Sequence, residues 1–451
     1  MRRPKAGFVG FGEVNTPREI IERKCSGARK ELERRNIDLV HTDPVGDDPE
    51  GKEALRACRE LAREDFDFLV VCIAGWIPSH TVVRVISEFS HKPLLLWGLA
   101  GYVEDGRLVT TADQAGTTAI RKTMEDMGYR FRFVYSCPGS PPKMDRIEAF
   151  AKAARAVTLL KSSKVGMMGF RDMNLYATLY DGVSLRGKIG PEVEVFTMLE
   201  IVQKMEKLDR IKVRDVVETL KERWTFERRP REETLQKGVE LYLAIREKLQ
   251  ERDYQAVSLV DVDGMKKLMN FPPAMVLMLL SDEANVCTIP ENDTLGAVTQ
   301  LMARYVTGQI GAYMEFYEFL EDRVLVGVPD YVPSEIVDGR VRVTSTSFGG
   351  FGEGILNISR VKTGRVTLCR LSSKGDKYTM HMVTGTAVEP RKWEEAGWKP
   401  PAPQLPGLEV ILDVPMEEFA QKVLSQHYIL SYGDNTRALI DLCELLGIQV
   451  I

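Results

Sequence analysis

FDFLVVCIAG, residues 66–75, is an apolar run rich in β-branched and aromatic residues and too short to cross a membrane as a helix. Comparable short runs lie on both sides of it: AGFVGF (6–11), DLVHT (38–42), KPLLLWG (92–98) and RFRFVYS (130–136). Amphipathic segments of helical length separate these runs. Short buried strands that alternate with helices are typical of a parallel sheet covered on both faces. We therefore predict a Rossmann-like, doubly wound α/β domain over residues 1–161.

A second alternating series follows the Pro-rich segment CPGSPPK (137–143) and the helix that we expect after it. Its apolar runs are KVGMMGF (164–170), EVEVFTM (192–198), QAVSLVDV (255–262), NVCTIPE (285–291) and GAYMEF (311–316). Segments of helical length again lie between the runs. This pattern predicts a second Rossmann-like, doubly wound parallel-sheet domain over residues 162–324.

The pattern changes after residue 324, where strand-like runs follow one another with Gly-rich turns and without helices between them. These runs are RVRVTSTSF (340–348), ILNISRV (355–361), GRVTLCRLS (364–372) and KYTMHMVTGTAV (377–388). Such a succession is typical of an antiparallel sheet or small barrel. We predict a C-terminal antiparallel β-barrel-like domain over residues 325–451, ending in an amphipathic helix.

The composition argues against several classes of protein. The 61 Lys and Arg residues nearly balance the 65 Asp and Glu residues, so we expect neither nucleic acid nor a membrane surface as a partner. The seven cysteines form no CxxC pair, which argues against a disulfide framework and a thiolate zinc site. With no export signal or membrane-spanning run in the sequence, we expect a soluble, cytoplasmic protein.

Two glutamates follow apolar runs at the places where parallel strands carry their ligand-binding residues. Glu291 ends VCTIPE and Glu315 ends GAYME, and a single helix-length segment separates the two runs. We expect their strands to be neighbours in one sheet, which would bring the two carboxylates together. Taken alone, a Glu before a helix is more often a partner of the helix dipole than a functional group.

His427 is the third candidate ligand, because it lies in the short strand-like segment SQHYILSYGD near the start of the last helix. Two carboxylates and one imidazole form a ligand set that suits Mn²⁺, Mg²⁺, Fe²⁺ or Co²⁺ and leaves positions open for substrate oxygens. The Gly-rich segment GFVGFGE (7–13) leaves a nucleotide site as a weaker interpretation, since its spacing differs from GxGxxG.

Several segments, in the same order along the chain, resemble the L-fucose isomerase and L-arabinose isomerase family of metal-dependent isomerases. CTIPENDTLGAVTQLM (287–302) is similar to the metal-binding turn of that family, GRVTLCRLS with YTMHMVTG to its barrel hairpin, and QHYILSYGDNTRALIDLCELLGIQV (426–450) to its terminal segment. The resemblance places Glu291, Glu315 and His427 on the three metal ligands. It implies Mn²⁺, or another divalent cation such as Mg²⁺, Co²⁺ or Fe²⁺, as the cofactor.

The resemblance also implies residues that bind the sugar. GFRDMNLYATLYDGV, from Gly169, is similar to the family's sugar-contact segment and contains Arg171 and Met173, while Gln426 stands where the family has an amide. CIAGWIPS (72–79) resembles a first-domain loop, which implies that Trp76 reaches a neighbouring subunit's sugar in a homo-oligomer, for which we favour a hexamer. VGVPD (326–330) replaces the further ligand histidine of arabinose isomerases, which favours a Glu/Glu/His site of the fucose type.

The function implied by the resemblance is that of a metal-dependent aldose–ketose isomerase. It would act on a pentose or 6-deoxyhexose similar to L-fucose, D-arabinose or L-arabinose through an enediol, with Glu291 and Glu315 as catalytic groups. Two alternatives stay open. The same scaffold could act on a phosphorylated or sulfonated sugar, or the chain could be a non-catalytic sugar-binding or regulatory protein.

Overall fold

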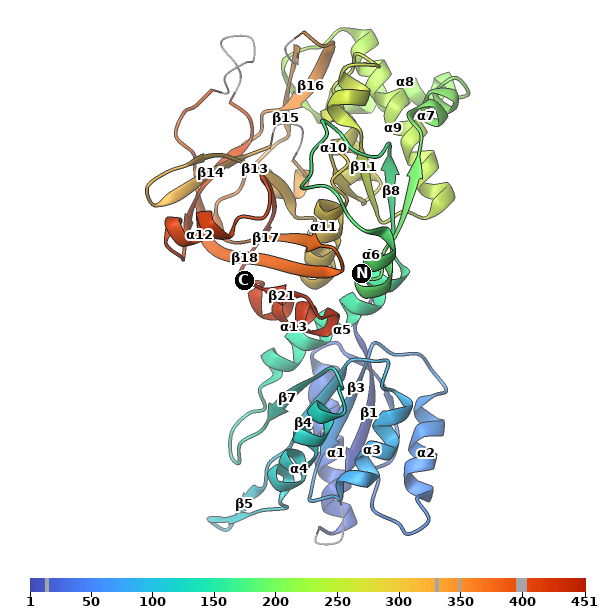
Figure 1. Cartoon of the computed structure of the whole chain (residues 1–451), viewed down its shortest axis with the longest axis vertical. Coiled ribbons are helices and arrows are strands. Elements are labelled where there is room, and N and C mark those ends of the chain that lie inside the picture. Colours follow the sequence, from blue (N-terminus) through green and yellow to red (C-terminus); the bar gives the residue numbers. More distant parts are fainter. Residues whose placement is uncertain (13–15, 329–331, 348–349, 395–403) are drawn as a thin grey trace. The chain divides into compact units, whose positions relative to one another are not determined.

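The computed structural model describes residues 1–12, 16–328, 332–347, 350–394 and 404–451, and these pack as two compact units (Figure 1). The first unit comprises Met1–Leu159 with Arg437–Leu446, and the second comprises Leu160–Thr436 with Gly447–Ile451. Within the described residues, no helix is both long enough and apolar enough to cross a membrane. The three-domain division with boundaries after residues 161 and 324 stays a prediction.

The first unit is built on a parallel sheet, as the alternating pattern predicts. Its strands are β1 (Lys5–Phe11), β2 (Asp38–His41), β3 (Phe68–Ile73), β4 (Leu94–Gly98) and β7 (Phe131–Tyr135), in the order β2-β1-β3-β4-β7. All residues of β3 are buried, which explains its continuous apolar run. Over residues 1–162 the other elements are α1 (Arg18–Arg34), α2 (Lys52–Leu61), α3 (Ser79–Glu88), the hairpin β5 (Tyr102–Glu104) and β6 (Arg107–Val109), α4 (Asp113–Asp126) and α5 (Met144–Ser162), whose last three residues belong to the second unit.

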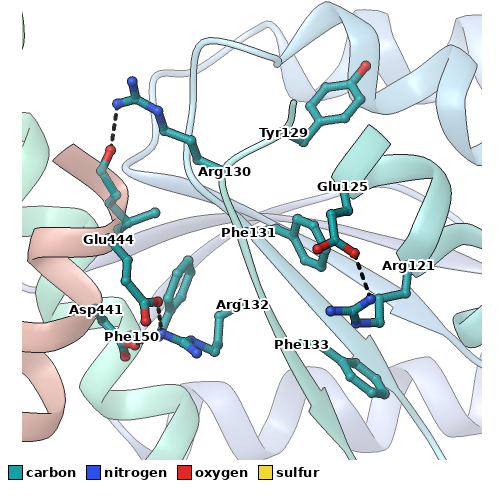
Figure 2. A pocket seen from close by; sticks show the side chains of 11 residues that line it. Arg121, Glu125, Tyr129, Arg130, Phe131, Arg132, Phe133, Phe150, Asp441 and Glu444 are labelled. Carbon is teal, nitrogen blue, oxygen red and sulfur yellow. Dashed lines mark hydrogen bonds and ion pairs between the residues drawn. The ribbon is translucent and has the colours of Figure 1, made fainter. Parts of the chain in front are cut away.

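The last helix of the chain, α13 (Thr436–Leu446), packs with the first unit over residues Arg437–Leu446. Its buried Asp441 accepts a hydrogen bond of 2.5 Å from Arg132 on β7 and is also contacted by Arg146. Arg130 donates to the carbonyl of Leu445 at 2.6 Å. Figure 2 shows Arg130, Arg132 and Asp441 beside a cavity of about 610 Å³ along β7. The contacts hold the C-terminal helix to the edge strand of the first sheet.

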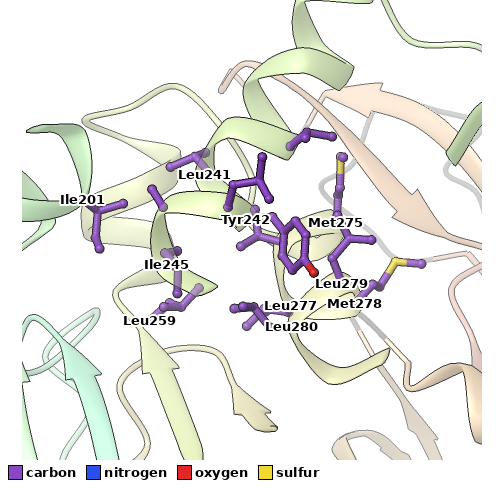
Figure 3. Packing of buried hydrophobic residues seen from close by; sticks show 14 of the residues in the cluster. Ile201, Leu241, Tyr242, Ile245, Leu259, Met275, Leu277, Met278, Leu279 and Leu280 are labelled. Atoms are coloured by element: carbon purple, nitrogen blue, oxygen red, sulfur yellow. The ribbon is translucent and has the colours of Figure 1, made fainter. Parts of the chain in front are cut away.

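The second unit contains another parallel sheet, made of β8 (Lys164–Met168), β9 (Glu192–Phe196), β11 (Ala256–Leu259) and β12 (Cys287–Ile289) in the order β12-β11-β8-β9. Leu241 and Tyr242 of one helix pack with Met275 and Leu279 of another in an apolar cluster of this unit (Figure 3). The helices of this part are α6 (Gly182–Lys188), α7 (Met198–Met205), α8 (Arg210–Arg223), α9 (Glu232–Arg252), a π-helix (Asp261–Lys266), α10 (Ala274–Glu283) and α11 (Thr294–Thr307).

A closed antiparallel barrel completes the second unit, as predicted for the runs at 364–372 and 377–388. The runs at 340–348 and 355–361, which we also assigned to it, lie in a separate sheet. The six strands of the barrel are β13 (Ala312–Phe319), β14 (Arg323–Gly327), β17 (Gly364–Lys374), β18 (Lys377–Val388), β19 (Gly407–Leu412) and β20 (His427–Tyr432). They follow the order β17-β20-β13-β14-β19-β18, and β18 pairs with β17 to close the ring. The other elements are β10 (Thr225–Arg228), β15 (Arg342–Ser347) and β16 (Glu353–Asn357) in a separate sheet, a 3₁₀ turn (Ser334–Ile336), α12 (Met416–Lys422), and β21 (Gln449–Val450) on β18.

The prediction that the strands preceding Glu291 and Glu315 are neighbours in one sheet is wrong. β12 belongs to the parallel sheet, whereas β13 belongs to the barrel. The reason is α11, which joins them and is buried along nearly its whole length. One side of α11 contacts β11 and β12, and another contacts β17 and β20, so the helix carries the chain from the sheet to the barrel.

Candidate metal-binding site

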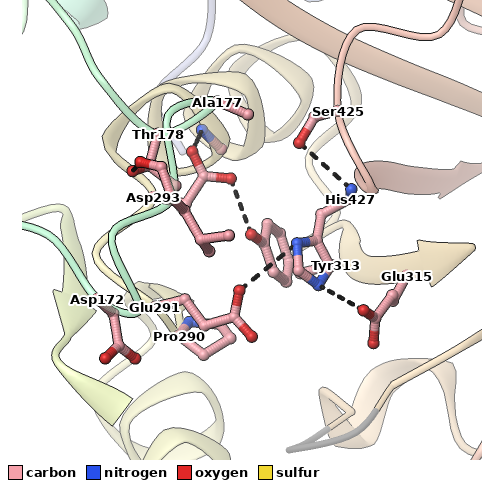
Figure 4. Close-up of polar contacts among 12 residues, drawn as sticks. Asp172, Ala177, Thr178, Pro290, Glu291, Asp293, Tyr313, Glu315, Ser425 and His427 are labelled. Carbon is pink, nitrogen blue, oxygen red and sulfur yellow. Dashed lines mark hydrogen bonds and ion pairs between the residues drawn. The ribbon is translucent and has the colours of Figure 1, made fainter. Parts of the chain in front are cut away.

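The three predicted ligands lie together in the second unit, as Figure 4 shows. The Oε2 atom of Glu291 is 3.8 Å from Nδ1 of His427, and the Oε1 atom of Glu315 is 4.0 Å from Nε2 of the same ring. The side chain of His427 is 1% exposed, that of Glu291 9% and that of Glu315 29%. One wall of the site is therefore buried, and Glu315 lies on its more open side.

Strand pairing in the barrel brings Glu315 and His427 together. The two residues stand directly opposite each other in the antiparallel pair of β13 and β20. Since side chains alternate along a strand, Tyr313 shares the face of Glu315, whereas Met314 and Tyr428 point the other way into the barrel core. Tyr428 therefore lies on the face opposite His427.

Glu291 reaches the site from the turn that follows β12. Glu291 and Asn292 both adopt left-handed backbone conformations, with φ of 63° and 52°. Such conformations are uncommon for residues other than glycine and persist where surrounding contacts hold them. Here the side chain of Asn292 donates to the carbonyl of Met168 at 2.9 Å, and its backbone N–H donates to the carbonyl of Leu259 at 3.1 Å. The ends of β8 and β11 thus hold the turn that presents Glu291.

A buried polar network lies behind the histidine. The ring of Tyr313 stacks on that of His427, with centroids 4.3 Å apart and planes inclined by 22°. The hydroxyl of Tyr313 donates to Asp293 at 2.8 Å. Asp293 begins α11, where it accepts the N–H of Gly296 at 2.9 Å, and the guanidinium of Arg370 on β17 contacts both of its oxygens. The network ties the start of α11 to two barrel strands.

Burial and the contact between Asp293 and Arg370 set the charge states in this region. Burial lowers the pKa of His427 to about 3, so its imidazole is neutral at pH 7 and can offer a lone pair. Burial also raises the pKa of Asp293, but the charge and hydrogen bonds of Arg370 outweigh this effect, and the pKa of that carboxyl lies below its ordinary value. Asp293 and Arg370 therefore form a charged pair.

The donor set suits a divalent cation in its chemistry. Nε2 of His427 is buried and has no hydrogen-bond partner within the described residues, and it faces the carboxylate of Glu315. A neutral imidazole nitrogen with two carboxylates is a ligand set of Mn²⁺, Fe²⁺ and similar ions. Within the described ranges, however, no three or more His, Cys, Asp or Glu side chains lie in positions that could together hold a metal ion. Glu291 and Glu315 face different nitrogens of the ring.

Two of the predicted sugar-binding residues lie in the loop after β8, at the same carboxyl edge of the sheet as Glu291. Arg171 is half-buried; it donates to Asn174 at 2.9 Å and lies over the ring of Tyr176 at 5.1 Å from the centroid. Met173 is 38% exposed, with a left-handed φ of 47°. Their contact with a sugar stays a prediction.

Gln426 lies directly before β20, where its carbonyl accepts the N–H of Phe316 at 3.0 Å. Trp76 belongs to the first unit, follows β3 and is 39% exposed. Its backbone N–H donates to the carbonyl of Thr111 at 2.9 Å. The role of Trp76 in a neighbouring subunit stays a prediction. In the segment VGVPD, Pro329 and Asp330 lie outside the described residues, as do residues 13–15 after the first Gly-rich segment.

Sequence reasoning missed the residues behind the ligands. Tyr313 stands two positions before Glu315, so strand alternation alone indicates that it shares the face of the site. Arg370 is a single charge inside the apolar strand VTLCRL, a pattern that indicates a buried partner. Asp293 precedes a helix, which explains its cap but not its pairing with Arg370.

Comparisons with known proteins add little to this description. No family model matches the chain, and no curated protein matches it. One similar solved structure is an ABC transporter periplasmic solute binding protein from Actinobacillus succinogenes 130z with bound D-allose, 11% identical to this chain. The match covers 73% of this chain and 95% of that one, with a TM-score of 0.17.

Proposed function

We propose that this protein is a metal-dependent aldose–ketose isomerase that acts on a pentose or 6-deoxyhexose through an enediol. The observation that carries the proposal is that His427 lies 3.8 Å from Glu291 and 4.0 Å from Glu315, although the three residues come from a sheet turn and two barrel strands. The resemblance of their sequence segments to the fucose and arabinose isomerases gives the reaction class.

Glu291, Glu315 and His427 would hold the cation, here Mn²⁺ or another divalent ion. When bound, the cation would polarise the two neighbouring oxygens of the sugar and stabilise negative charge on them. The neutral imidazole adds no charge, so the two carboxylates match the charge of a divalent ion.

The isomerisation takes a proton from C2 of the aldose and delivers one to C1, while the proton of the C2 hydroxyl passes to O1. A carboxylate next to both carbons can accept the first proton and return it. Glu315 is favoured for this role because its side chain is 29% exposed, whereas that of Glu291 is 9% exposed. Arg171, Met173 and Gln426 would orient the sugar, and Trp76 of a neighbouring copy in a hexamer would cover it.

The test combines metal analysis with a panel of aldoses. Chelator-treated protein is reloaded with Mn²⁺, Mg²⁺ or Co²⁺ and assayed for ketose, with deuterium incorporation from D₂O as evidence for an enediol. His427→Asn should lose both metal and activity, and His41→Asn, a change on β2 of the first unit, serves as the control. Ketose formed only from phosphorylated or sulfonated aldoses would favour the substituted-sugar alternative. Sugar binding without turnover would favour a binding protein and contradict the proposal.

A further inference from the structure

The polar network behind His427 is as deeply buried as that histidine and more deeply buried than the two candidate glutamates. Tyr313, Asp293 and Arg370 are each 1% exposed, and they join α11 to strands β13 and β17. A buried Arg–Asp pair is a costly way to hold two elements together, because desolvating both charges offsets much of their attraction. Apolar side chains of the same volume would serve as well for packing alone. The network therefore calls for a role beyond packing.

The geometry of the histidine indicates that role. A ligand histidine is usually oriented by a hydrogen bond from its second ring nitrogen to a carboxylate or carbonyl. In this site each ring nitrogen faces a candidate ligand, Glu291 on one side and Glu315 on the other, at distances too long for hydrogen bonds. The ring of Tyr313, stacked at 4.3 Å and 22°, is the contact that defines the plane of the imidazole.

The orientation of Tyr313 is in turn held by the ion pair. Its hydroxyl donates to Oδ2 of Asp293 at 2.8 Å, and the same carboxylate receives the guanidinium fork of Arg370. Oδ1 of Asp293 also accepts the N–H of Gly296 at 2.9 Å, so the acceptor is fixed to the first turn of α11. Contacts from two strands and one helix thus leave the tyrosine ring little freedom to rotate.

We propose that Tyr313 is a positioning residue that holds the imidazole plane of His427 for metal binding, with Asp293 and Arg370 keeping Tyr313 in place. This inference rests on the proposed function, because it assigns His427 as a ligand. Loss of contacts that orient a ligand typically weakens metal binding about 10–100-fold. Tyr313→Leu removes the stack and should show a loss in this range. Tyr313→Phe keeps the ring and removes only the hydroxyl, so its loss should be smaller.

The experiment titrates Mn²⁺ alone into chelator-treated full-length protein and follows binding by electron paramagnetic resonance. Tyr305→Phe is the matched control, since Tyr305 is a buried tyrosine of α11 whose hydroxyl lies 2.7 Å from Ser163 Oγ. Histidine ring NMR signals of the metal-free protein supply a second readout, compared between wild type and Tyr313→Phe because both keep an aromatic ring stacked on His427. The chain has 5 His residues, so the signal of His427 can be assigned with His427→Asn.

The inference predicts weaker Mn²⁺ binding in the order wild type, Tyr313→Phe, Tyr313→Leu, with a shifted and broadened His427 signal and a control equal to wild type. If Tyr313→Leu does not fold, Tyr313→Phe and Asp293→Asn carry the test. Mn²⁺ affinities and His427 signals equal to those of the control would overturn the inference while leaving the metal site standing. Wild-type protein that binds no Mn²⁺ would overturn both proposals. Metal binding that follows the predicted order, without ketose from any aldose, would overturn only the isomerase assignment.

Discussion

Replacing Arg370 by Met should destabilise the second unit by about 3–5 kcal/mol, the cost typical of removing one partner from a buried ion pair. Both side chains of the pair are 1% exposed, and the guanidinium contacts both oxygens of Asp293. Methionine occupies a similar volume but leaves the carboxylate, among the described residues, with only Tyr313 and Gly296 as donors, at 2.8 and 2.9 Å. An uncompensated charge then stays buried.

The assay is thermal unfolding followed by calorimetry at pH 7. For a large unit, about 2 °C is lost per kcal/mol, so the transition of the second unit should fall by about 6–10 °C. Arg365→Met is the matched control on the same strand, because its pair with Asp413 has side chains 41% and 42% exposed and should contribute less than about 1 kcal/mol. Arg370→Met combined with Asp293→Asn removes both charges and should recover most of the loss.

The pH dependence gives an independent check. In the wild type, burial raises the pKa of Asp293, but the effect of Arg370 is larger and the pKa is lowered. The ion pair therefore stabilises the fold fully above the ordinary carboxyl pKa, and this stabilisation is lost as pH falls through the lowered pKa. Without Arg370, burial leaves the pKa of Asp293 raised in the folded state, so the cost of burying its ionised carboxylate grows as pH rises. The gap between wild type and Arg370→Met should be wider at pH 8 than at pH 5. An equal gap at both pH values, with no recovery in the double variant, would refute this reasoning.

Three further predictions follow from the site and the barrel. Glu315→Gln keeps the shape of the side chain but removes its charge and its basicity, so turnover to ketose should fall by more than the roughly 10²–10⁴-fold typical of losing an acid–base group. Saturating Mn²⁺ should restore only the part of this loss that comes from weaker metal binding. Unchanged turnover would exclude Glu315 from the mechanism. His381 lies in the barrel, with its Nδ1 2.7 Å from the hydroxyl of Tyr428. Burial lowers the pKa of His381 to about 4. Below about pH 6.5 the unfolded chain therefore binds a proton at His381 that the folded chain does not bind. His381→Gln should lessen the loss of unfolding free energy between about pH 6.5 and 4 by up to about 3 kcal/mol, measured by denaturant titration. An unchanged dependence of the unfolding free energy on pH would contradict this. If Trp76 serves a neighbouring copy, mixing and reassembling Trp76→Ala with Glu315→Gln should regain activity that neither has alone, and a fully active monomer by light scattering would rule out the assembly.

Local sequence patterns predicted the elements and the character of each sheet. The continuous apolar run at residues 66–75 supplies the fully buried strand β3, and the closely spaced runs after residue 364 form the barrel hairpin β17–β18. Alternation along β20 places His427 and Tyr428 on opposite faces. These features follow from periodicity, which indicates the faces of a segment that must be buried.

Only the tertiary structure decided which partners cover those faces. Glu315 meets His427 because β13 pairs with β20, and Asp293 meets Arg370 because α11 packs against the barrel as well as the sheet. Residues Arg437–Leu446 join the first unit through contacts such as that of Arg132 with Asp441. Each contact joins residues far apart in the chain, and its stability depends on shared burial and on hydrogen bonds that no local pattern specifies. The sequence by itself therefore determined the strands, the helices and the candidate ligands, while long-range packing brought the ligands to one place.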